Sequence, residues 1–543
     1  MKTKLFLLHV ILLSNLIVSS AQPVQVWAVY YHDTTWAYDG AAALALDASG
    51  NVYVGGWSGG VPDPNYNEWV IIKYTNSGTQ LWAAKYDGSS GLDDKIYAMT
   101  VDTTGIVFAT GSIYEGIGGW NLGTGRWSAA GAFQWMNSYN GPFFAVYDQG
   151  NAIAIAPDAS VYVCGVAENG AHHDLATIKY DPATGVRAWV TLYDGPGSLG
   201  EDLGRDIAVD AAGYIYVTGE SQANNTQTDY VTIKYNSTGV AQWTQRYNSP
   251  DSLTDIPTGL AIDGAGNTYV TGWSIIGTSG NFDCVTVKYD AAGNEAWVRN
   301  YDTSLVDDRG YDVAVDNDGN ILVAARQAST PSNSGWVVIK YNTSGDTLWS
   351  SLYVNSGFPK KIITDQNNNV YIGGTDPHPA STDDYEILKY DSAGTFQWVL
   401  IVDGASNNAD QLVDFTLDNA GNIYVTGKSF DTAIAAYVIL TAKYSQVAGV
   451  QENNFSENSF LNQNYPNPCS GSTKISYSLK ERGPVSLKVY DMLGNEIQTL
   501  VNKNESAGNH EIIFDGKNIF AGVYYYRLAV NDFYAMKKMI VIH

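Results

Sequence analysis

Cysteine and long apolar segments are scarce in this chain. Its 543 residues include three cysteines, Cys164, Cys284 and Cys469, so there is no even set from which a disulfide framework could be built. After residue 21, no stretch reaches the roughly 18 consecutive apolar residues of a membrane-spanning helix. We therefore expect a mature chain that is stabilised by packing and has no transmembrane helix.

Positive charge is also scarce. Lys and Arg number 30 against 55 Asp and Glu, which gives a net charge of −25. Residues 461–543 hold 9 basic and 7 acidic residues, so the part before them carries a net charge of −27. Such an acidic surface repels phosphate backbones, which excludes nucleic acid as a favourable partner. Divalent cations and neutral or basic ligands such as glycans suit it better.

The first 21 residues differ from the rest. Lys2 and Lys4 precede an apolar run over residues 5–18, and the small residues 19–21 that follow suit signal peptidase. This pattern predicts a secretory signal peptide over 1–21 with cleavage after Ala21. We therefore expect the mature protein to be secreted or displayed on the outer cell surface.

One phrase recurs eight times at intervals of 49 to 55 residues. Its clearest copy runs from Ile207 through Asp210, Tyr216 and Lys234 to Trp243. A period this constant is typical of one supersecondary unit that is stacked many times. We call the position of Tyr216 in this copy the anchor position. In the eight copies it is held by Tyr53, Phe108, Tyr162, Tyr216, Tyr269, Leu322, Tyr371 and Tyr424.

Each copy contains four short runs of strand type, separated by turns rich in Gly, Asn and Asp. Four antiparallel strands repeated radially make a β-propeller, for which an open solenoid is the alternative. The fourth strand-type run of a copy contains a tryptophan, as Trp243 does in the clearest copy, and we call it the Trp strand. The eighth copy stops after Lys443 and Tyr444 and lacks this strand, whereas the mature N-terminus begins with one, which contains Trp27 and Tyr31. We therefore predict an all-β chain with an eight-bladed propeller over 22–446, closed by strands from its N- and C-terminal ends.

The phrase Asp-x-x-Gly-Asn-x-Tyr-Val-x-Gly, as in residues 263–272, resembles the bacterial SBBP-type β-propeller repeat. The resemblance covers about four-fifths of the chain and implies the propeller fold. It says little about the ligand, because propellers serve both as binding proteins and as enzymes.

The repeat ends before a polar stretch over 447–460, rich in Asn, Glu and Ser, which we interpret as a linker. Short strand-type runs separated by glycines follow over 461–543 and predict a small Ig-like β-sandwich. The runs are 474–479, 485–490, 496–501, 510–514, 523–529 and 536–542.

Four landmarks of this tail resemble the type A sorting domain of the type IX secretion system, found in Bacteroidetes. They are Tyr-Pro-Asn-Pro at 465–468, Val-Tyr-Asp at 489–491, Ala-Gly-Val-Tyr at 521–524 and Lys-Lys-Met at 537–539. Cys469 departs from the bulky apolar residue usual in that family. The resemblance implies Sec export, the type IX machinery as a partner, removal of the tail, and release or attachment at the cell surface. A carbohydrate-binding or adhesive sandwich is the alternative.

An Asp stands 14 residues before the anchor residue in seven of the eight copies. Seven carboxylates around one mouth of the channel would repel one another unless they were solvated, protonated or bridged by a cation such as Ca²⁺. The competing interpretation, which the repetition favours, is that each Asp accepts backbone N–H groups of its own inter-blade loop. The candidates are Asp39, Asp94, Asp148, Asp202, Asp255, Asp308 and Asp410.

In each copy a loop follows the strand that begins at the anchor residue, as Tyr-Val-Thr-Gly does at 216–219, and these loops vary in length between copies. Variable loops on a rigid scaffold are common binding sites. Exposed aromatic rings beside carboxylates suit glycan stacking or a protein epitope, although the same rings could simply pack these loops onto the ring. The adjacent histidines at 172 and 173 lack a third metal ligand in the sequence. The candidate binding residues are Trp57, Tyr66, Tyr114, Glu115, Trp120, Trp127, His172, His173 and Trp273.

Three hypotheses about function follow. The preferred one is a secreted or cell-surface binding protein that engages a glycan or protein through the variable-loop face. The second is an extracellular propeller glycan hydrolase or lyase, which needs two carboxyl groups about 5 to 9.5 Å apart across the scissile bond. The third is a purely structural surface-layer component. No catalytic residue stands out in the sequence.

Overall fold

The computed structural model describes two stretches, 22–446 and 460–541, with short gaps. The gaps are 34–37, 60–65, 89–91, 117–118, 143–145, 171, 197–199, 224–226, 278–279, 304–306, 329–333, 378–382, 405, 407, 465, 468, 470, 481, 492–495, 518, 521 and 531–532. The predicted signal peptide and nearly all of the predicted linker lie outside the described residues. The chain divides into two compact units, 1–448 and 449–543. Within the described residues, no helix is long and apolar enough to cross a membrane.

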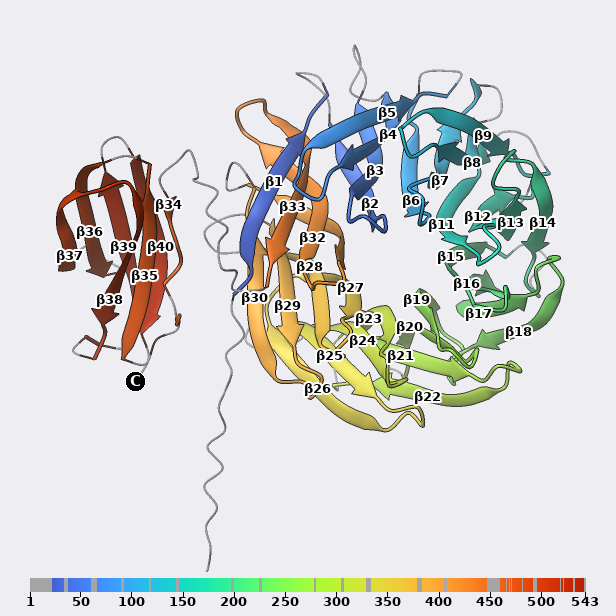
Figure 1. The fold of residues 1–543 in the computed structure, drawn as a ribbon. Coiled ribbons are helices and arrows are strands. Elements are labelled where there is room, and N and C mark those ends of the chain that lie inside the picture. Colours follow the sequence, from blue (N-terminus) through green and yellow to red (C-terminus); the bar gives the residue numbers. More distant parts are fainter. Residues whose placement is uncertain are drawn as a thin grey trace, which may run out of the picture. The chain divides into compact units, whose positions relative to one another are not determined.

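The described part of the first unit consists of sheets that follow one another along the chain and whose strands pair antiparallel, except for the short β10 (Val146–Tyr147; Figure 1). We number these sheets from 1 to 8 in chain order. Sheet 1 contains β2 (Gly40–Leu46), β3 (Val52–Gly59), β4 (Asn67–Tyr74) and β5 (Gln80–Tyr86). Sheet 2 contains β6 (Lys95–Val101), β7 (Val107–Tyr114), β8 (Gly119–Trp127) and β9 (Phe133–Tyr139), with the short β10 (Val146–Tyr147) added parallel to β8. Sheet 3 contains β11 (Gln149–Ile155), β12 (Val161–Glu168), β13 (His173–Tyr180) and β14 (Arg187–Tyr193).

The remaining sheets of this unit repeat the same order. Sheet 4 contains β15 (Asp202–Val209), β16 (Ile215–Gln222), β17 (Thr228–Tyr235) and β18 (Ala241–Tyr247); sheet 5 contains β19 (Asp255–Ile262), β20 (Thr268–Ile275), β21 (Phe282–Tyr289) and β22 (Glu295–Tyr301). Sheet 6 contains β23 (Asp308–Val315), β24 (Ile321–Gln327), β25 (Gly335–Tyr341) and β26 (Thr347–Val354); sheet 7 contains β27 (Phe358–Thr364), β28 (Val370–Pro377), β29 (Asp383–Tyr390) and β30 (Phe396–Val402). Sheet 8 contains β31 (Asp410–Leu417), β32 (Ile423–Asp431), β33 (Ala436–Ser445) and, from the N-terminus, β1 (Val24–Tyr31).

The fourth strand of sheet 8 comes from the other end of the chain. β1 pairs antiparallel with β33, and Trp27 lies opposite Lys443. The other sheets have the same register, for example Lys234 opposite Trp243 in sheet 4. In Figure 1 the blue β1 accordingly lies beside the orange β33. The N-terminal Trp strand thus stands where the eighth copy of the repeat lacks one.

In seven of the eight sheets an Asp of the repeated phrase holds its own turn, whereas sheet 3 has Ala156 at that position. In sheet 5, Asp263 Oδ1 accepts the backbone N–H groups of Ala265 and Asn267 at 2.9 Å, and Gly266 adopts a φ of +81° that favours glycine. The hydroxyl of Tyr269 donates to Asp263 Oδ2 at 3.0 Å. The anchor aromatic therefore ties its strand to the preceding turn.

The repeated tryptophans link neighbouring sheets. Trp243 of sheet 4 donates its Nε1–H to the carbonyl of Ala291 in sheet 5, and Trp27 donates in the same way to Asn76 in sheet 1. Trp398 of sheet 7 has no such partner among the described residues, since the turn between β33 and β1 is replaced by the two chain ends. The repeated lysines lie over the anchor rings, as Lys234 does at 4.8 Å from the Tyr216 centroid. Both sets are packed between sheets, as their repetition predicts.

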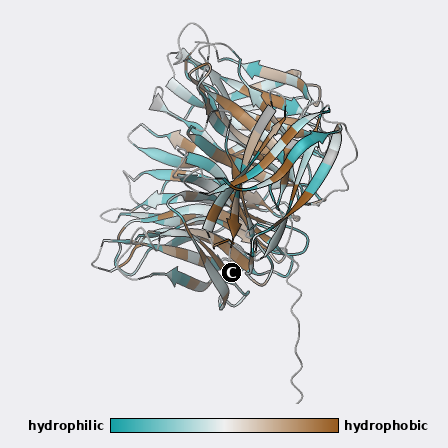
Figure 2. Ribbon diagram, turned by 90° about the vertical axis from the view of Figure 1, so that its left-hand side faces the viewer, coloured by the Kyte–Doolittle hydropathy of each residue, from teal (hydrophilic) through white to brown (hydrophobic). Residues whose placement is uncertain are grey.

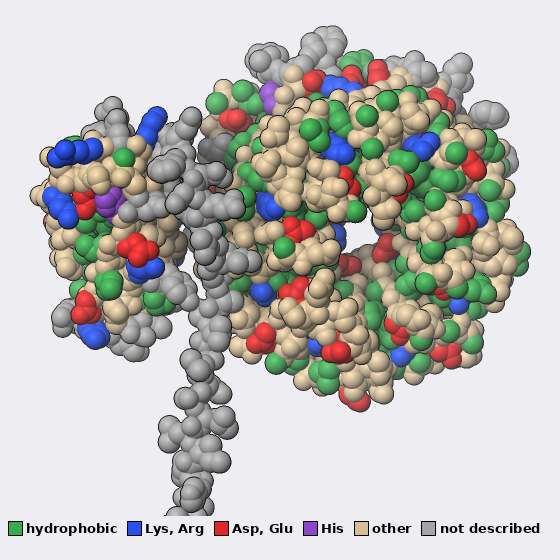
Figure 3. All heavy atoms as spheres, viewed as in Figure 1, with side chains coloured by type: hydrophobic (Ala, Val, Ile, Leu, Met, Phe, Trp, Pro, Cys, Tyr) green, Lys and Arg blue, Asp and Glu red, His purple; other side chains and the backbone are tan. Residues whose placement is uncertain are grey.

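The buried part of the first unit lies in the middle strands of the sheets. Most of β3 and β4 is buried, whereas the outer β5 is largely half-buried or exposed. In Figure 2 the hydrophobic segments, coloured brown, lie within the strands. The first strands of successive sheets contact one another around a central opening, which Figure 3 shows as a hollow with acidic side chains at its edge.

The second unit packs two sheets against each other. One sheet contains β34 (Phe460–Leu461), β35 (Ser472–Leu479) and β38 (Gly508–Asp515). The other contains β36 (Gly483–Asp491), β37 (Glu496–Glu505), β39 (Gly522–Val530) and β40 (Phe533–Val541). Their inward side chains, such as Ile475, Leu487, Phe514 and Tyr526, share one buried core. The six predicted strands of the tail are present, each within a few residues of its predicted ends.

Candidate functional site

The seven repeated Asp residues lie at or just before the start of the first strand of their sheets, and each is at most 2% exposed. Each accepts a backbone N–H of the loop that precedes it. The N–O distances are 3.4 Å from Asp33 to Asp39, 2.6 Å from Gly88 to Asp94, 2.8 Å from Gly141 to Asp148, 2.7 Å from Gly195 to Asp202, 2.8 Å from Ser249 to Asp255, 2.8 Å from Thr303 to Asp308 and 2.6 Å from Gly404 to Asp410. These contacts fit the loop-capping interpretation, and a cation ring of all seven stays a prediction that no contact supports.

Burial sets the acidity of these carboxyl groups. It raises the pKa of Asp255 to about 6, although the N–H and hydroxyl of Ser249 and the hydroxyl of Ser274 act in the opposite direction. Burial likewise raises the pKa to about 6 for Asp94, Asp202, Asp308 and Asp410. Because one environment repeats from sheet to sheet, these shifts belong to the fold and do not mark one sheet as a site.

The structure brings together a set of polar and aromatic side chains where sheet 1 meets sheet 8. A cavity of about 300 Å³ lies here, bounded by Tyr38, Asp39, Trp57, Gln411, Lys428 and Tyr437. Its volume is at the lower end of the about 300–1,000 Å³ that is usual for ligand sites. We call it the Trp57 pocket.

Trp57 and Lys428 form the wall of the Trp57 pocket. Each directly follows the last glycine of the repeated phrase, Trp57 in β3 and Lys428 in β32, and the Lys428 ammonium lies 4.8 Å from the Trp57 ring centroid. Burial and the nearby Lys95 lower the pKa of Lys428. Residue 40 must be glycine for this arrangement, because a Cβ there would lie 2.5 Å from the Trp57 ring. The indole is thus held in place beside a partly dehydrated cation.

Two tyrosines extend the aromatic surface of the Trp57 pocket. The rings of Tyr38 and Tyr437 lie 6.4 Å apart, and 46% of Tyr38 is exposed. Gln411, also exposed, offers an amide that both donates and accepts hydrogen bonds. Aromatic faces beside a few polar groups can bind a ligand that has both an apolar face and hydroxyl groups.

The other predicted binding residues do not gather with Trp57 into one site. Tyr114 packs edge-on against Trp120 at 5.2 Å, and Trp120 donates its Nε1–H to the carbonyl of Asp93. Glu115 accepts hydrogen bonds from Asn121 and Ser138. Tyr66 is half-buried ahead of β4. These contacts largely follow the alternative in which the loop side chains pack onto the sheets.

Two predicted tryptophans are covered by neighbouring side chains. Trp127 is 1% exposed and packs against Trp69 in the core between sheets 1 and 2. The reason is that Arg126 and Trp127 stand where other sheets have adjacent Lys and Tyr residues, such as Lys234 and Tyr235. Trp127 therefore ends a core strand and does not belong to the loop face. Trp273 lies against Phe282 at 4.5 Å and beneath the Arg309 guanidinium at 5.3 Å.

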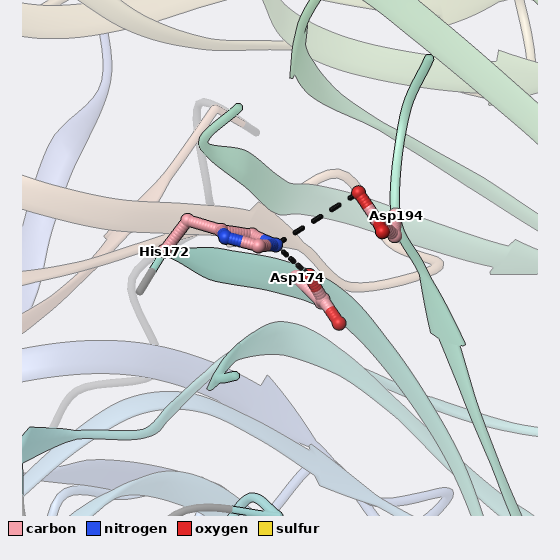
Figure 4. A group of neighbouring side chains, drawn as sticks. All are labelled: His172, Asp174 and Asp194. Atoms are coloured by element: carbon pink, nitrogen blue, oxygen red, sulfur yellow. Dashed lines mark ion pairs between the residues drawn. The ribbon is translucent and has the colours of Figure 1, made fainter. Parts of the chain in front are cut away.

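The two adjacent histidines point to different partners. His173 Nδ1 lies 2.6 Å from Glu201 Oε2. His172 instead lies between two carboxylates, with its Nε2 3.4 Å from Asp174 Oδ1 and 3.9 Å from Asp194 Oδ1 (Figure 4). Burial and the neighbouring Asp194 raise the pKa of Asp174, which the His172 ring lowers. We call these three residues the His172 cluster.

Sequence reasoning missed Tyr38, Gln411, Lys428 and Tyr437 of the Trp57 pocket and Asp194 of the His172 cluster. A usable signal was present for Lys428, since it occupies in sheet 8 the same repeat position as Trp57 in sheet 1, and the first strands of these two sheets contact each other. The tyrosines carry no such signal.

Family models match two parts of the chain. The secretion system C-terminal sorting domain matches residues 463–542, and the β-propeller repeat of the SBBP type matches residues 189–225 and 242–277. The sorting domain implies an interaction with the secretion machinery and export to the cell surface or the extracellular space. Among curated proteins, no sequence matches this chain.

Solved structures with a similar course of the chain have low sequence identity. Sqt1 of Chaetomium thermophilum, bound to the N-terminus of ribosomal protein L10, is 11% identical with a TM-score of 0.48, covering 76% of this chain and 98% of its own. PorZ, a surface component of the type IX secretion system of Porphyromonas gingivalis, is 13% identical with a TM-score of 0.36, covering 93% and 66%. The polysaccharide lyase Uly1 is 9% identical with a TM-score of 0.44, covering 75% and 90%. These similarities do not show what this chain binds. The family matches do show that this chain contains β-propeller repeats of the SBBP type, over 189–225 and 242–277, and a C-terminal sorting domain of a secretion system over 463–542.

Proposed function

We propose that this chain is a secreted or cell-surface binding protein whose first unit is a closed, eight-bladed propeller and whose ligand is a glycan held in the Trp57 pocket. In this proposal residues 1–21 direct Sec export, and the tail, an Ig-like sandwich, directs passage through the type IX system. The observation that carries the binding assignment is the cavity between sheets 1 and 8, which combines three aromatic rings with Gln411 and Lys428.

The closed ring is supported by contacts that cross from sheet 8 to sheet 1. Asp414 Oδ2 accepts the backbone N–H of Leu44 at 2.9 Å, the same bond that joins Asp206 to Leu260 between sheets 4 and 5. The Trp27 bond to Asn76 repeats another contact between neighbouring sheets. Closure matters for function because it creates the Trp57 pocket.

A glycan suits the pocket because aromatic rings and polar groups lie next to each other there. The Trp57 face and the two tyrosine rings would stack on the C–H face of a sugar, and the polar groups of Gln411 and Lys428 would bond its hydroxyls. The negative charge of the first unit favours a neutral sugar over a uronic acid or sulfated glycan.

The hydrolase or lyase alternative is less well supported at this position. Among the described residues that line the Trp57 pocket, Asp39 is the only carboxylic acid, and it is 1% exposed and bonded to His32 and Asp33. Glycoside hydrolysis needs a second carboxyl group across the scissile bond. The pocket is therefore better suited to holding a sugar than to cutting one.

The test is binding of the purified full chain to an array of neutral glycans, followed by the Trp57→Ala variant. We expect binding with a Kd in about the micromolar to millimolar range, weakened at least about tenfold by loss of one stacking ring. Trp273→Ala is the matched control, because Trp273 holds the same repeat position in sheet 5 but lies under Arg309. An equal loss of glycan affinity in the two variants, or no glycan bound at all, would refute the assignment. Release of shortened sugars would support the hydrolase or lyase alternative.

A further inference from the structure

The His172 cluster gathers three ligand-type atoms in sheet 3. His172 precedes β13, Asp174 lies within it, and Asp194 follows β14. One ring nitrogen of His172 and one carboxylate oxygen each of Asp174 and Asp194 lie within 4.8 Å of one another. Figure 4 shows the His172 ring edge directed at both carboxylates, one from β13 and one from the segment after β14.

A comparison with the other sheets indicates that His172 is the member of the cluster that does not recur, because sheet 7 has Asp384 at the position of Asp174 and Asp403 at the position of Asp194. In three sheets the acid at the position of Asp174 faces a cross-strand donor: Glu68 faces Lys85, Asp229 faces Arg246 and Asp283 faces Asn300. In sheet 7 the donor position holds the apolar Ile401. In sheet 3 the donor position holds Leu192, which lies opposite Ala176 just as Arg246 lies opposite Val231. Asp174 therefore lacks the donor of those three sheets and has His172 beside it.

The buried polar atoms of the cluster are not satisfied by hydrogen bonds. Side-chain exposure is 8% for His172 and 3% for Asp174. Among the described residues, neither ring nitrogen of His172 nor Asp174 Oδ1 has a hydrogen-bond partner. Leaving such buried atoms unpaired costs stability, so a ligand that engages them would stabilise the fold.

A hydrogen bond from Asn169 holds the cluster in place, and the exposed Asp194 side chain leaves it accessible to solvent. Asn169 Nδ2 donates to Asp174 Oδ2 at 2.9 Å, which orients the carboxylate and leaves Oδ1 directed at His172. Hydrogen bonds of this kind orient metal ligands. The Asp194 side chain is 48% exposed, so an ion can enter from its side.

We propose that His172, Asp174 and Asp194 bind a zinc ion. Zinc takes one imidazole and two carboxylate ligands readily, at about 2.0–2.2 Å, which places tetrahedral ligand atoms roughly 3.3 Å apart. The observed separations of 3.4 and 3.9 Å need only a small closure to reach that value. Calcium prefers six to eight oxygen ligands, so the imidazole nitrogen disfavours it. Three protein ligands leave a fourth position for water or for a group of a partner molecule.

The test is calorimetric titration of the chelator-treated full chain with zinc chloride at pH 7.5, repeated with cobalt(II) and its visible absorption. We expect one saturable site per chain, an affinity at least about tenfold lower in His172→Gln and Asp194→Asn, and no change in His173→Gln, whose imidazole faces Glu201 outside the cluster. The absence of a one-to-one site, or equal binding by all three variants, would overturn the proposal. So would calcium displacing zinc at equal concentration.

A second variant separates metal binding from folding. Leu192→Arg introduces the cross-strand donor that sheet 4 has in Arg246. Its guanidinium should form an ion pair with Asp174, as Arg246 does with Asp229. We expect zinc binding to be lost while the unfolding temperature stays equal to or above that of the zinc-free parent chain. Zinc binding at parental affinity in Leu192→Arg would contradict the proposed ligand set.

Discussion

At the scale of single residues, the fold uses Asp in two opposite ways. In the turns of the repeated phrase, burial opposes ionisation of Asp263, but hydrogen bonds from Asn267 and Tyr269 outweigh it and hold its pKa below the usual value. At the strand starts, burial outweighs the bonds and raises the pKa of Asp255 to about 6. The first kind stabilises the fold at neutral pH, and the second kind costs stability there.

This contrast predicts opposite effects of two conservative substitutions. The contribution of Asp255 is fully present below its unfolded pKa and is lost as pH rises through about 6, so Asp255→Asn should stabilise the chain at pH 7.5 by about 1–3 kcal/mol and make no difference near pH 4. The contribution of Asp263 is present above its unfolded pKa and is lost as pH falls, so Asp263→Asn should destabilise at pH 7.5. Thermal unfolding at the two pH values measures both, and a destabilised Asp255→Asn variant at pH 7.5 would contradict this account.

At the scale of strands and turns, the anchor tyrosine is more than a core residue. Tyr269 and Tyr289 are both fully buried in sheet 5, but the Tyr269 hydroxyl donates to Asp263, whereas the Tyr289 hydroxyl has no hydrogen-bond partner among the described residues. The ring supplies packing in both cases. The hydroxyl contributes at the anchor position alone.

Two Tyr→Phe substitutions in this sheet test that difference. Tyr269→Phe should lower the stability of the first unit by about 1–1.5 kcal/mol, because the half-buried carboxylate of Asp263 loses a hydrogen bond. Tyr289→Phe should be neutral or slightly stabilising, since it removes a buried hydroxyl without a partner. Chemical denaturation of both variants checks this, and an equal loss in the two would mean that the turn bond contributes nothing.

The strands could be predicted from the sequence because their signals are local and repeat. Tyr216, Lys234 and Trp243 recur at fixed spacing, and the glycine turns between them need no tertiary information. Trp127 was misplaced because the second copy replaces the Lys-Tyr pair, so the pattern that marks a core strand is absent there. A one-off substitution in a repeat can signal either a site or an altered core position, and burial is needed to distinguish the two.

At the scale of the whole molecule, the candidate sites depend on contacts between distant segments. Trp57 and Lys428 are 371 residues apart in the sequence, and only the meeting of sheets 1 and 8 brings them together. His172 and Asp194 meet because β13 and β14 pair and both ends turn to the same side. The sequence contains the residues of both sites, but the distances between them follow from how the sheets pair and pack.

The most direct test of the closed ring is a cysteine pair across β1 and β33. Ala28 lies opposite Ala442 in the register of these strands, so Ala28→Cys with Ala442→Cys should form a disulfide that peptide mass mapping detects. Ala28→Cys with Leu440→Cys, two residues out of register, should remain reduced. If the in-register pair stays reduced, or if both pairs oxidise equally, β1 does not occupy the edge of sheet 8, and the Trp57 pocket loses its basis.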